Sequence, residues 1–269
     1  MKLKFFNLKF FQKKQTHAPA VGEVSQKTLH KNLDFTATEQ YKLLRANLDF
    51  TIPAGEKCPV IGVTSAMRGE GKSTTAVNLS YVLAERGSKV LLIDGDLRIP
   101  SIAKKMGLKS SPGLTDVLMG KESHVMSEFK STLLDTWYVM PSGDIPPNPS
   151  ELLGSKRMET VLTHLRKFFD YIIIDLPPVN VVSDATSISS LITGMVLVVR
   201  EEYGEKKELE RCFRQLQLSN VNILGCVVNG SKAGSGSYGK YKKYRYYKYS
   251  RYYYKRGYEY ASTNTEESK

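Results

Sequence analysis

The sequence is poor in cysteine, and its three cysteines lie far apart. Cys58, Cys212 and Cys226 have neither the close spacing of zinc ligands nor that of a redox pair. Cys226 lies within an apolar run, which is typical of a small buried hydrophobic residue. The sequence therefore excludes a disulfide framework, and we expect a protein of a reducing compartment.

Long apolar runs are also missing. No run approaches the roughly 20 residues that span a bilayer, and the first residues lack the apolar stretch and cleavage site of a secretion signal. We therefore expect a cytoplasmic protein. The formal net charge of +12 is concentrated at the two ends. Residues 1–14 contain five lysines, residues 238–260 contain eight lysines and arginines against one glutamate, and the sequence between them is nearly neutral.

Short apolar runs recur along the neutral part of the sequence, and they predict strands. They are almost continuously hydrophobic rather than alternating, as strands covered on both faces are. Segments with helical periodicity separate them, at 72–86, 150–169 and 205–218. Strands that alternate with helices predict an α/β fold, a doubly wound and mostly parallel sheet with helices on both faces. The predicted strands are 59–65, 89–96, 137–143, 171–178, 195–200 and 222–230.

Composition divides the chain into three parts. Residues 1–34 form a basic N-terminal segment. Residues 35–230 form the α/β domain, which begins with an amphipathic helix at 35–50. Residues 231–269 contain a linker rich in glycine and serine and then the tyrosine-rich tail, residues 238–260. The like charges of this tail and its lack of aliphatic residues predict disorder.

One strand-to-helix junction, "AMRGEGKST" beginning at Ala66, has the sequence of a phosphate-binding loop, although such loops usually begin with glycine. Gly69 and Gly71 allow backbone N–H groups to turn toward phosphate oxygens, and the dipole of the following helix adds to the attraction. Lys72 is placed to contact the β- and γ-phosphates, and the Ser73 hydroxyl to bind Mg²⁺. The expected nucleotide-binding residues are Gly69, Glu70, Gly71, Lys72, Ser73 and Thr74.

Two further predicted strands end in acidic residues, Asp94 and Asp96 after one and Asp175 after the other. Because the carboxyl ends of parallel strands share one edge of a sheet, we expect these carboxylates to converge on the phosphate-binding loop. Mg²⁺ that is bound together with phosphate needs a few carboxylates in one place. Arg98, just beyond Asp96, is placed either to contact phosphate or to pair with an acid.

These motifs resemble those of the bacterial tyrosine kinases, the P-loop kinases of capsule and exopolysaccharide assembly. "AMRGEGKST", "LLIDGDLRIP" and "IIIDLPP" are similar to the Walker A, Walker A′ and Walker B motifs of that family. The connecting segments "PGLTDVLMG" and "PSGDIPPNPSELLGS" are similar as well, so the resemblance covers roughly residues 35–230. It implies a fold of the P-loop NTPase type and a non-specific protein-tyrosine kinase that uses ATP and Mg²⁺.

The resemblance also implies roles for individual residues. Lys72 would hold ATP, and Asp96 would orient the incoming tyrosine hydroxyl or accept its proton. Because phosphoryl transfer needs chiefly positioning and charge neutralisation, no separate nucleophile is expected. The implied catalytic residues are Lys72, Asp94, Asp96 and Arg98, and the implied metal ligands are Ser73, Asp94 and Asp175.

In that family a helix with one glutamate and two arginines drives ring-like self-association. Here "EQYKLLR" supplies Glu39, Lys42 and Arg45, and the lysine in the middle keeps the charge but loses the bidentate geometry of arginine. Further partners are implied: a transmembrane adaptor that activates the kinase and holds it at the inner face of the cell membrane, and a cognate tyrosine phosphatase. No nucleic acid is expected.

The tail has a counterpart in the family, where it is autophosphorylated between subunits in the regulation of polysaccharide synthesis and export. At about 3.3 Å per extended residue, the linker and tail can reach their own active site or a neighbour's. The implied phosphate acceptors are the eleven tail tyrosines: Tyr238, Tyr241, Tyr244, Tyr246, Tyr247, Tyr249, Tyr252, Tyr253, Tyr254, Tyr258 and Tyr260.

Two other interpretations remain open. A partition-type or septum-positioning ATPase carries a signature lysine five residues before the lysine of the loop, where this chain has Met67 followed by Arg68. The basic, aromatic tail would also suit nucleic acid or an anionic membrane, because cations neutralise phosphates and rings stack on bases. That interpretation does not explain why the aromatic residues of the tail are all tyrosine.

Overall fold

The structure is a computed structural model of the sequence, and it describes residues 5–7, 32–120, 129, 131 and 133–230. Most of the basic N-terminal segment and the whole of the tyrosine-rich tail lie outside these residues. The predictions for the two ends of the chain, and the boundaries of the three parts, therefore stay predictions.

The described strands form one parallel sheet in the order β1-β7-β6-β2-β5-β3-β4. Every neighbouring pair is parallel, which confirms the predicted class of fold. The sequence does not predict β1, a short strand that pairs with β7. The strands are β1 (Phe5–Asn7), β2 (Val60–Ser65), β3 (Val90–Asp94), β4 (Trp137–Met140), β5 (Tyr171–Asp175), β6 (Gly194–Arg200) and β7 (Ile223–Asn229).

Successive residues of each central strand enter different hydrophobic layers, so the sheet is buried on both faces. On β2, Ile61 packs into one layer and Val60 into the other. On β3, Leu92 and Leu91 divide between the same two layers. Strands of this kind need apolar side chains at nearly every position, and this is why their sequence runs are continuous rather than alternating.

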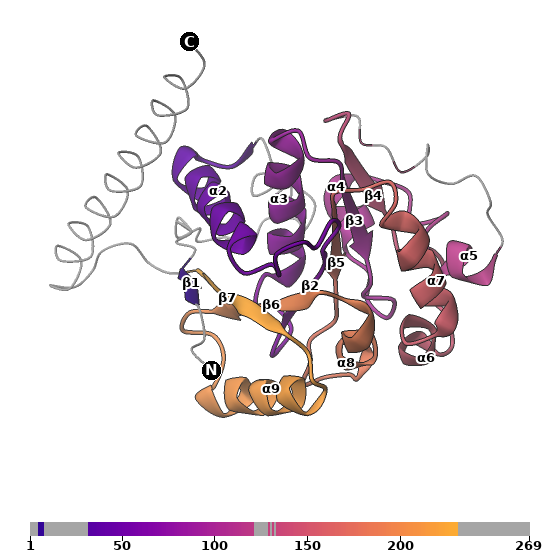
Figure 1. Cartoon of the computed structure of the whole chain (residues 1–269). Helices are drawn as coiled ribbons and strands as arrows, with labels where there is room; N and C mark the ends of the chain where they lie inside the picture. The colour runs from indigo at the N-terminus through magenta and orange to yellow at the C-terminus, as the bar shows by residue number, and fades with distance from the viewer. Residues whose placement is uncertain (1–4, 8–31, 121–128, 130, 132, 231–269) are drawn as a thin grey trace, which may run out of the picture. The chain divides into compact units, whose positions relative to one another are not determined.

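Helices cover both faces of the sheet, as Figure 1 shows. The layer that contains Ile61 is completed by α2 (Phe35–Asp49) and α3 (Lys72–Glu85). The opposite layer is completed by a second group of helices. That group is α5 (Leu114–Met119), α6 (Pro149–Leu153), α7 (Lys156–Leu165), α8 (Asp184–Ser187) and α9 (Lys206–Leu218), while α4 (Ile102–Met106) and the 3₁₀-helix η3 (Ser189–Leu191) are short connecting turns.

The amphipathic helix predicted at 35–50 is α2. The Asp34 carboxylate caps it by accepting the N–H of Ala37 at 2.7 Å. Its buried side chains recur every three or four residues, and Tyr41, Leu44 and Leu48 pack into the same layer as α3. The helices predicted at 72–86 and 205–218 are also confirmed, as α3 and α9.

The single helix predicted at 150–169 is wrong, because the structure has two helices, α6 and α7, in this segment. Gly154 ends α6. The hydroxyl of Ser155 then accepts the N–H of Met158 at 3.1 Å and caps α7. Serine favours a cap over the middle of a helix since its side chain binds nearby backbone groups. The apolar periodicity of the segment does not reveal this interruption.

Cys58, Cys212 and Cys226 are all buried and free, and burial raises the pKa of the Cys226 thiol to about 12. None of the helices in the described ranges combines the length and the hydrophobicity that crossing a membrane requires.

Candidate active site

The phosphate-binding loop and the acidic residues meet at one edge of the sheet because of the strand order. β5 lies between β2 and β3, so the loop that follows β2 and the carboxylates that follow the other two strands are neighbours. Asp94 and Asp175 are register partners at the ends of β3 and β5. The predicted convergence of these residues is therefore present in the fold.

The loop between β2 and α3 turns at two glycines that have left-handed backbone conformations. Gly69 has φ +82° and Gly71 has φ +97°, values that other residues seldom adopt. A Cβ atom at Gly71 would meet Nδ2 of Asn229, and one at Gly69 would lie 2.6 Å from the hydroxyl oxygen of Tyr203. A side chain at either position would be strained by the backbone conformation, and it would displace the side chain of Asn229 or Tyr203.

The side chain of Glu70 braces the loop from inside. It is almost fully buried, and its carboxylate accepts the N–H of Met67 at 2.7 Å. Burial raises the pKa of Glu70, against the effect of the backbone N–H groups around it. The hydroxyl of Ser65 donates to the carbonyl of Met67 at 2.7 Å. Glu70 thus shapes the loop with its side chain, and only its backbone N–H is left for a phosphate.

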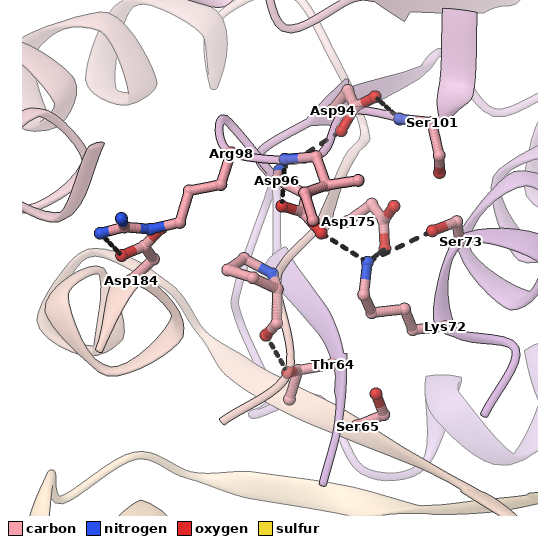
Figure 2. Close-up of polar contacts among 12 residues, drawn as sticks. Thr64, Ser65, Lys72, Ser73, Asp94, Asp96, Arg98, Ser101, Asp175 and Asp184 are labelled. Atoms are coloured by element: carbon pink, nitrogen blue, oxygen red, sulfur yellow. Dashed lines mark hydrogen bonds and ion pairs between the residues drawn. The ribbon is translucent and has the colours of Figure 1, made fainter. Parts of the chain in front are cut away.

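Lys72 lies at the centre of the acidic cluster (Figure 2). Its Nζ is 2.9 Å from Oδ2 of Asp96, 3.6 Å from Oδ1 of Asp175 and 3.4 Å from Oγ of Ser73. Burial disfavours the charged form of Lys72, but the carboxylates of Asp175 and Asp96 together leave its pKa raised. The ammonium group is therefore fixed in its charged form at the point where the loop meets the acids.

The carboxylate of Asp175 is fully buried, and neither of its oxygens accepts a hydrogen bond within the described structure. Burial raises its pKa, an effect that Lys72 opposes only in part. The carboxylate of Asp94 does have hydrogen-bond donors, because its Oδ2 accepts the N–H groups of Ser101 at 3.0 Å and Ile102 at 2.9 Å. Burial and then the proximity of Asp175 nevertheless raise the pKa of Asp94 to about 7.

Two buried carboxylates that carry raised pKa values beside a serine hydroxyl fit a divalent cation. The residues that the structure describes contain no group of three or more His, Cys, Asp or Glu side chains arranged to hold a metal by themselves. Mg²⁺ in proteins is usually held by one or two carboxylates together with phosphate oxygens and water. Ser73, Asp94 and Asp175 are the residues that would hold it.

Arg98 does not join this cluster, and Figure 2 shows its side chain directed away from Lys72. Its guanidinium donates to both oxygens of Asp184, at 2.9 and 3.0 Å, and to the hydroxyl of Ser150 at 3.3 Å. Asp184 is fully buried, so a bidentate pair with arginine is the arrangement that best compensates its charge. Of the two placements expected for Arg98, the structure has the pairing with an acid.

The comparisons with known proteins agree with this geometry. A sequence family described as "AAA domain" matches residues 58–222. The tyrosine-protein kinase YwqD of Bacillus subtilis is 39% identical over 197 residues, which cover 72% of this chain and 81% of that protein. The tyrosine-protein kinase CpsD of Streptococcus pneumoniae is 36% identical over 214 residues, which cover 78% and 92%. The chain belongs to the bacterial tyrosine-protein kinases.

Solved structures place the kinase in the same group. The kinase domain of the Escherichia coli tyrosine kinase ETK matches with a TM-score of 0.73 at 26% identity, over 87% of this chain and 95% of that one. The chimerical protein CapA2B2 matches with a TM-score of 0.73 at 28% identity, over 85% and 95%. The septum site-determining protein MinD of Pyrococcus horikoshii, complexed with Mg-ADP, matches less well, with a TM-score of 0.53 at 26% identity, over 64% and 70%.

The comparisons confirm the resemblance to the tyrosine kinases and the P-loop NTPase fold. They also rank the alternative of a septum-positioning ATPase below the kinase, since MinD matches less of the chain. The nucleotide in the MinD structure shows that a protein of this fold binds Mg-ADP. Relatives of this chain thus support a site for a nucleotide and Mg²⁺ in general terms.

Sequence reasoning missed four residues around the site of the kinase. Asp184 pairs with Arg98, and Arg200 and Asn229 contact the phosphate-binding loop. Lys105 on α4 lies near the cluster: burial lowers its pKa, with Asp175 and Lys72 acting on it in opposite directions. Arg200 and Asn229 could have been found from the sequence, because they end β6 and β7 and all carboxyl ends of parallel strands share one edge of the sheet. Nothing in the sequence marks Asp184 or Lys105.

The residues proposed for self-association do not form one set on the surface of α2. Glu39 and Lys42 pair with each other, with Nζ 3.0 Å from Oε1. Arg45 instead donates to the carbonyl of Val82 on α3 at 2.6 Å. Arg45 therefore takes part in the packing of α2 on α3 within the same chain. The tail tyrosines between Tyr238 and Tyr260 lie outside the described residues.

Proposed function

We propose that this kinase transfers the γ-phosphoryl group of Mg-ATP to the tyrosines of its own C-terminal tail, and that the transfer takes place between subunits. The observation that carries the proposal is the placement of the Lys72 ammonium within 2.9 Å of Asp96 and 3.6 Å of Asp175, at the end of a phosphate-binding loop. One cation thus faces two carboxylates where a phosphoryl group, a metal ion and a hydroxyl must meet.

Each side chain of the cluster has a distinct task in this proposal. Mg-ATP supplies the phosphoryl group and neutralises much of its charge. The backbone N–H groups of the loop bind phosphate oxygens. The ammonium group of Lys72 moves away from the carboxylates and binds phosphate oxygens as well. Asp94 and Asp175 hold the metal together with the hydroxyl of Ser73. The set needs no nucleophile of its own, because the tyrosine oxygen attacks.

Asp96 is the residue that we assign to the incoming tyrosine. Its Oδ1 accepts the N–H of Ile99 at 3.1 Å, which fixes the carboxylate, and its Oδ2 faces Lys72. Oδ2 becomes available to accept the proton of a tyrosine hydroxyl when the ammonium binds phosphate. Arg98 positions the Asp96 segment through its bidentate pair with Asp184.

The tail is the acceptor that we assign, for two reasons. β7 ends with Asn229 at the same edge as the phosphate-binding loop, and the linker to the tail follows directly. The tail contains eleven tyrosines within 23 residues.

We further propose the cellular setting of the kinase. Its subunits form a ring at the inner face of the membrane, where a transmembrane adaptor and a tyrosine phosphatase are its partners. In this setting the kinase regulates capsular or exopolysaccharide synthesis and export. One relative, of Klebsiella pneumoniae, carries the name "putative tyrosine-protein kinase in cps region", which supports this setting.

Transfer between subunits is tested by separating the active site from the acceptor. An active chain whose eleven tail tyrosines are replaced by phenylalanine is mixed with a Lys72→Met chain that keeps its tail. With Mg-ATP we expect phosphotyrosine on the tail of the Lys72→Met chain, detected by mass spectrometry. The Lys72→Met chain alone is the control and should remain unmodified. Phosphate that appears only when tail and Lys72 belong to one chain would show transfer within the subunit instead.

A further inference from the structure

The phosphate-binding loop is held from outside by two side chains at the ends of β6 and β7. Nη1 of Arg200 donates to the carbonyl of Gly69 at 3.2 Å, and Nδ2 of Asn229 donates to the carbonyl of Glu70 at 2.9 Å. Arg200 and Asn229 are register partners on neighbouring strands. They therefore reach the loop together, and we call this pair the latch residues.

Both latch residues are themselves fixed in place. The guanidinium of Arg200 lies over the ring of Tyr203, 4.8 Å from its centroid, a distance at which cation and ring attract each other. The hydroxyl of Tyr203 lies against Gly69. Nδ2 of Asn229 fills the space beside Gly71 that a Cβ atom would occupy. The latch residues and Tyr203 thus form a continuous contact along the outer side of the loop.

The geometry of the peptide unit connects this outer contact to phosphate binding. A peptide is planar, and its carbonyl and N–H point in opposite directions. When Asn229 holds the carbonyl of Glu70 outward, the N–H of Gly71 in the same peptide must face inward. Arg200 fixes the N–H of Glu70 in the same way through the carbonyl of Gly69. These N–H groups belong to the loop that binds phosphate oxygens.

The loop needs such support because two of its residues are glycine. Glycine populates positive and negative φ about equally, so a peptide beside Gly69 or Gly71 can flip at little steric cost. A flip would turn a carbonyl into the phosphate site and its N–H away from it. The carbonyl of Glu70, which is partly buried, also requires a donor, since an unpaired backbone group that is shielded from water is costly.

We propose that Arg200 and Asn229 are positioning residues for nucleotide binding, which act by locking two peptides of the loop and without contacting the phosphates. This inference rests on the nucleotide site proposed above. It predicts that the loss of either donor weakens Mg-ATP binding and leaves transfer at saturating ATP almost unchanged.

The test replaces each latch residue by an apolar residue of similar length, Asn229→Leu and Arg200→Met, in the full chain. Asn222→Leu and Arg211→Met are the matched controls, because Asn222 and Arg211 are exposed and lie at the opposite end of β7 and on α9. Arg200→Lys keeps a donor and should restore part of the affinity. The dissociation constant is measured with a fluorescent ATP analogue and Mg²⁺, and the Tm is measured for every variant.

We expect the dissociation constant to rise about fivefold to tenfold in each latch variant, as the loss of one hydrogen bond implies. The KM for ATP should rise with it while kcat changes less than about twofold, and amide hydrogen exchange of residues 66–73 should become faster at an unchanged Tm. If both latch variants bind the analogue as tightly as wild type, the inference is wrong. If wild type does not bind it either, the nucleotide site itself is wrong and the latch with it.

Discussion

At the scale of single residues, the site is a cluster of carboxylates with too little positive charge. Asp94, Asp96 and Asp175 surround Lys72, and the fully buried oxygens of Asp175 accept no hydrogen bond in the described structure. Burial is the main cause of the raised pKa values of Asp94 and Asp175, and at Asp94 the proximity of Asp175 raises the pKa further. A divalent cation restores the balance, and a protonated carboxyl group restores it when no cation is bound.

Metal binding should therefore depend on pH. With a pKa of about 7, Asp94 holds a proton at lower pH and must release it to bind Mg²⁺. We expect the affinity for Mg²⁺, measured by titration calorimetry in the presence of ADP, to rise up to about tenfold between about pH 6 and pH 8. The Asp94→Asn variant should bind Mg²⁺ more weakly, and its affinity should change less with pH. A wild-type affinity that is constant over this range would contradict the account.

The stability of the metal-free kinase should change in the opposite sense. A carboxyl group whose pKa is raised by folding stabilises the fold in its protonated form. For Asp94 this contribution is complete below its ordinary value of 3.8 and is lost as the pH rises through about 7. The Tm of wild type without Mg²⁺ should therefore fall relative to that of Asp94→Asn over this range. Equal pH profiles of the two proteins would argue against a protonated Asp94.

At the scale of secondary-structure elements, Arg45 on α2 has a contact within its own subunit. The resemblance assigns Arg45 to contacts between subunits, but in the structure its guanidinium binds the carbonyl of Val82, near the C-terminus of α3. The last four carbonyls of a helix have no partner within the helix, and a cation there also interacts favourably with the helix dipole. Arg45 thus caps α3 within its own subunit.

A comparison of Arg45→Met with Lys42→Met separates packing from assembly. Because Arg45 donates a charged hydrogen bond to α3, we expect Arg45→Met to lower the free energy of unfolding by about 1–2 kcal/mol in urea titrations. Lys42 pairs with Glu39 on a half-exposed part of α2, so Lys42→Met should cause no measurable change. An Arg45→Met protein as stable as wild type, but defective in self-association, would return Arg45 to the role that the resemblance assigns.

The sequence predicts elements and strand-end residues better than it predicts side-chain pairs. The strands appear in the structure because buried parallel strands need continuous apolar runs, and the acids meet the loop because carboxyl ends share one edge. The pair of Arg98 with Asp184 joins residues 86 positions apart, and that of Asn229 with Glu70 joins residues 159 apart. Such pairs depend on packing between distant elements, so no local pattern predicts them.

At the scale of the whole molecule, the sequence of the kinase combines a long, nearly neutral part with a strongly basic tail. The tail carries a formal charge of +7 from eight basic residues and one glutamate. Each phosphotyrosine adds about −1.5 to −2 at neutral pH, so roughly four of them cancel the charge of the tail. Phosphorylation would thereby change the surfaces with which the tail associates, and the basic residues set the starting point of that change.

Mapping of phosphate on the kinase tests whether the Lys72 cluster phosphorylates the tail. The purified full chain is incubated with Mg-ATP, the sites are mapped by mass spectrometry, and Lys72→Met is treated in parallel. We expect phosphate on tyrosines between Tyr238 and Tyr260 in wild type and none in Lys72→Met. Hydrolysis of ATP by wild type with a tail that stays unmodified would contradict the claim and would indicate an ATPase switch.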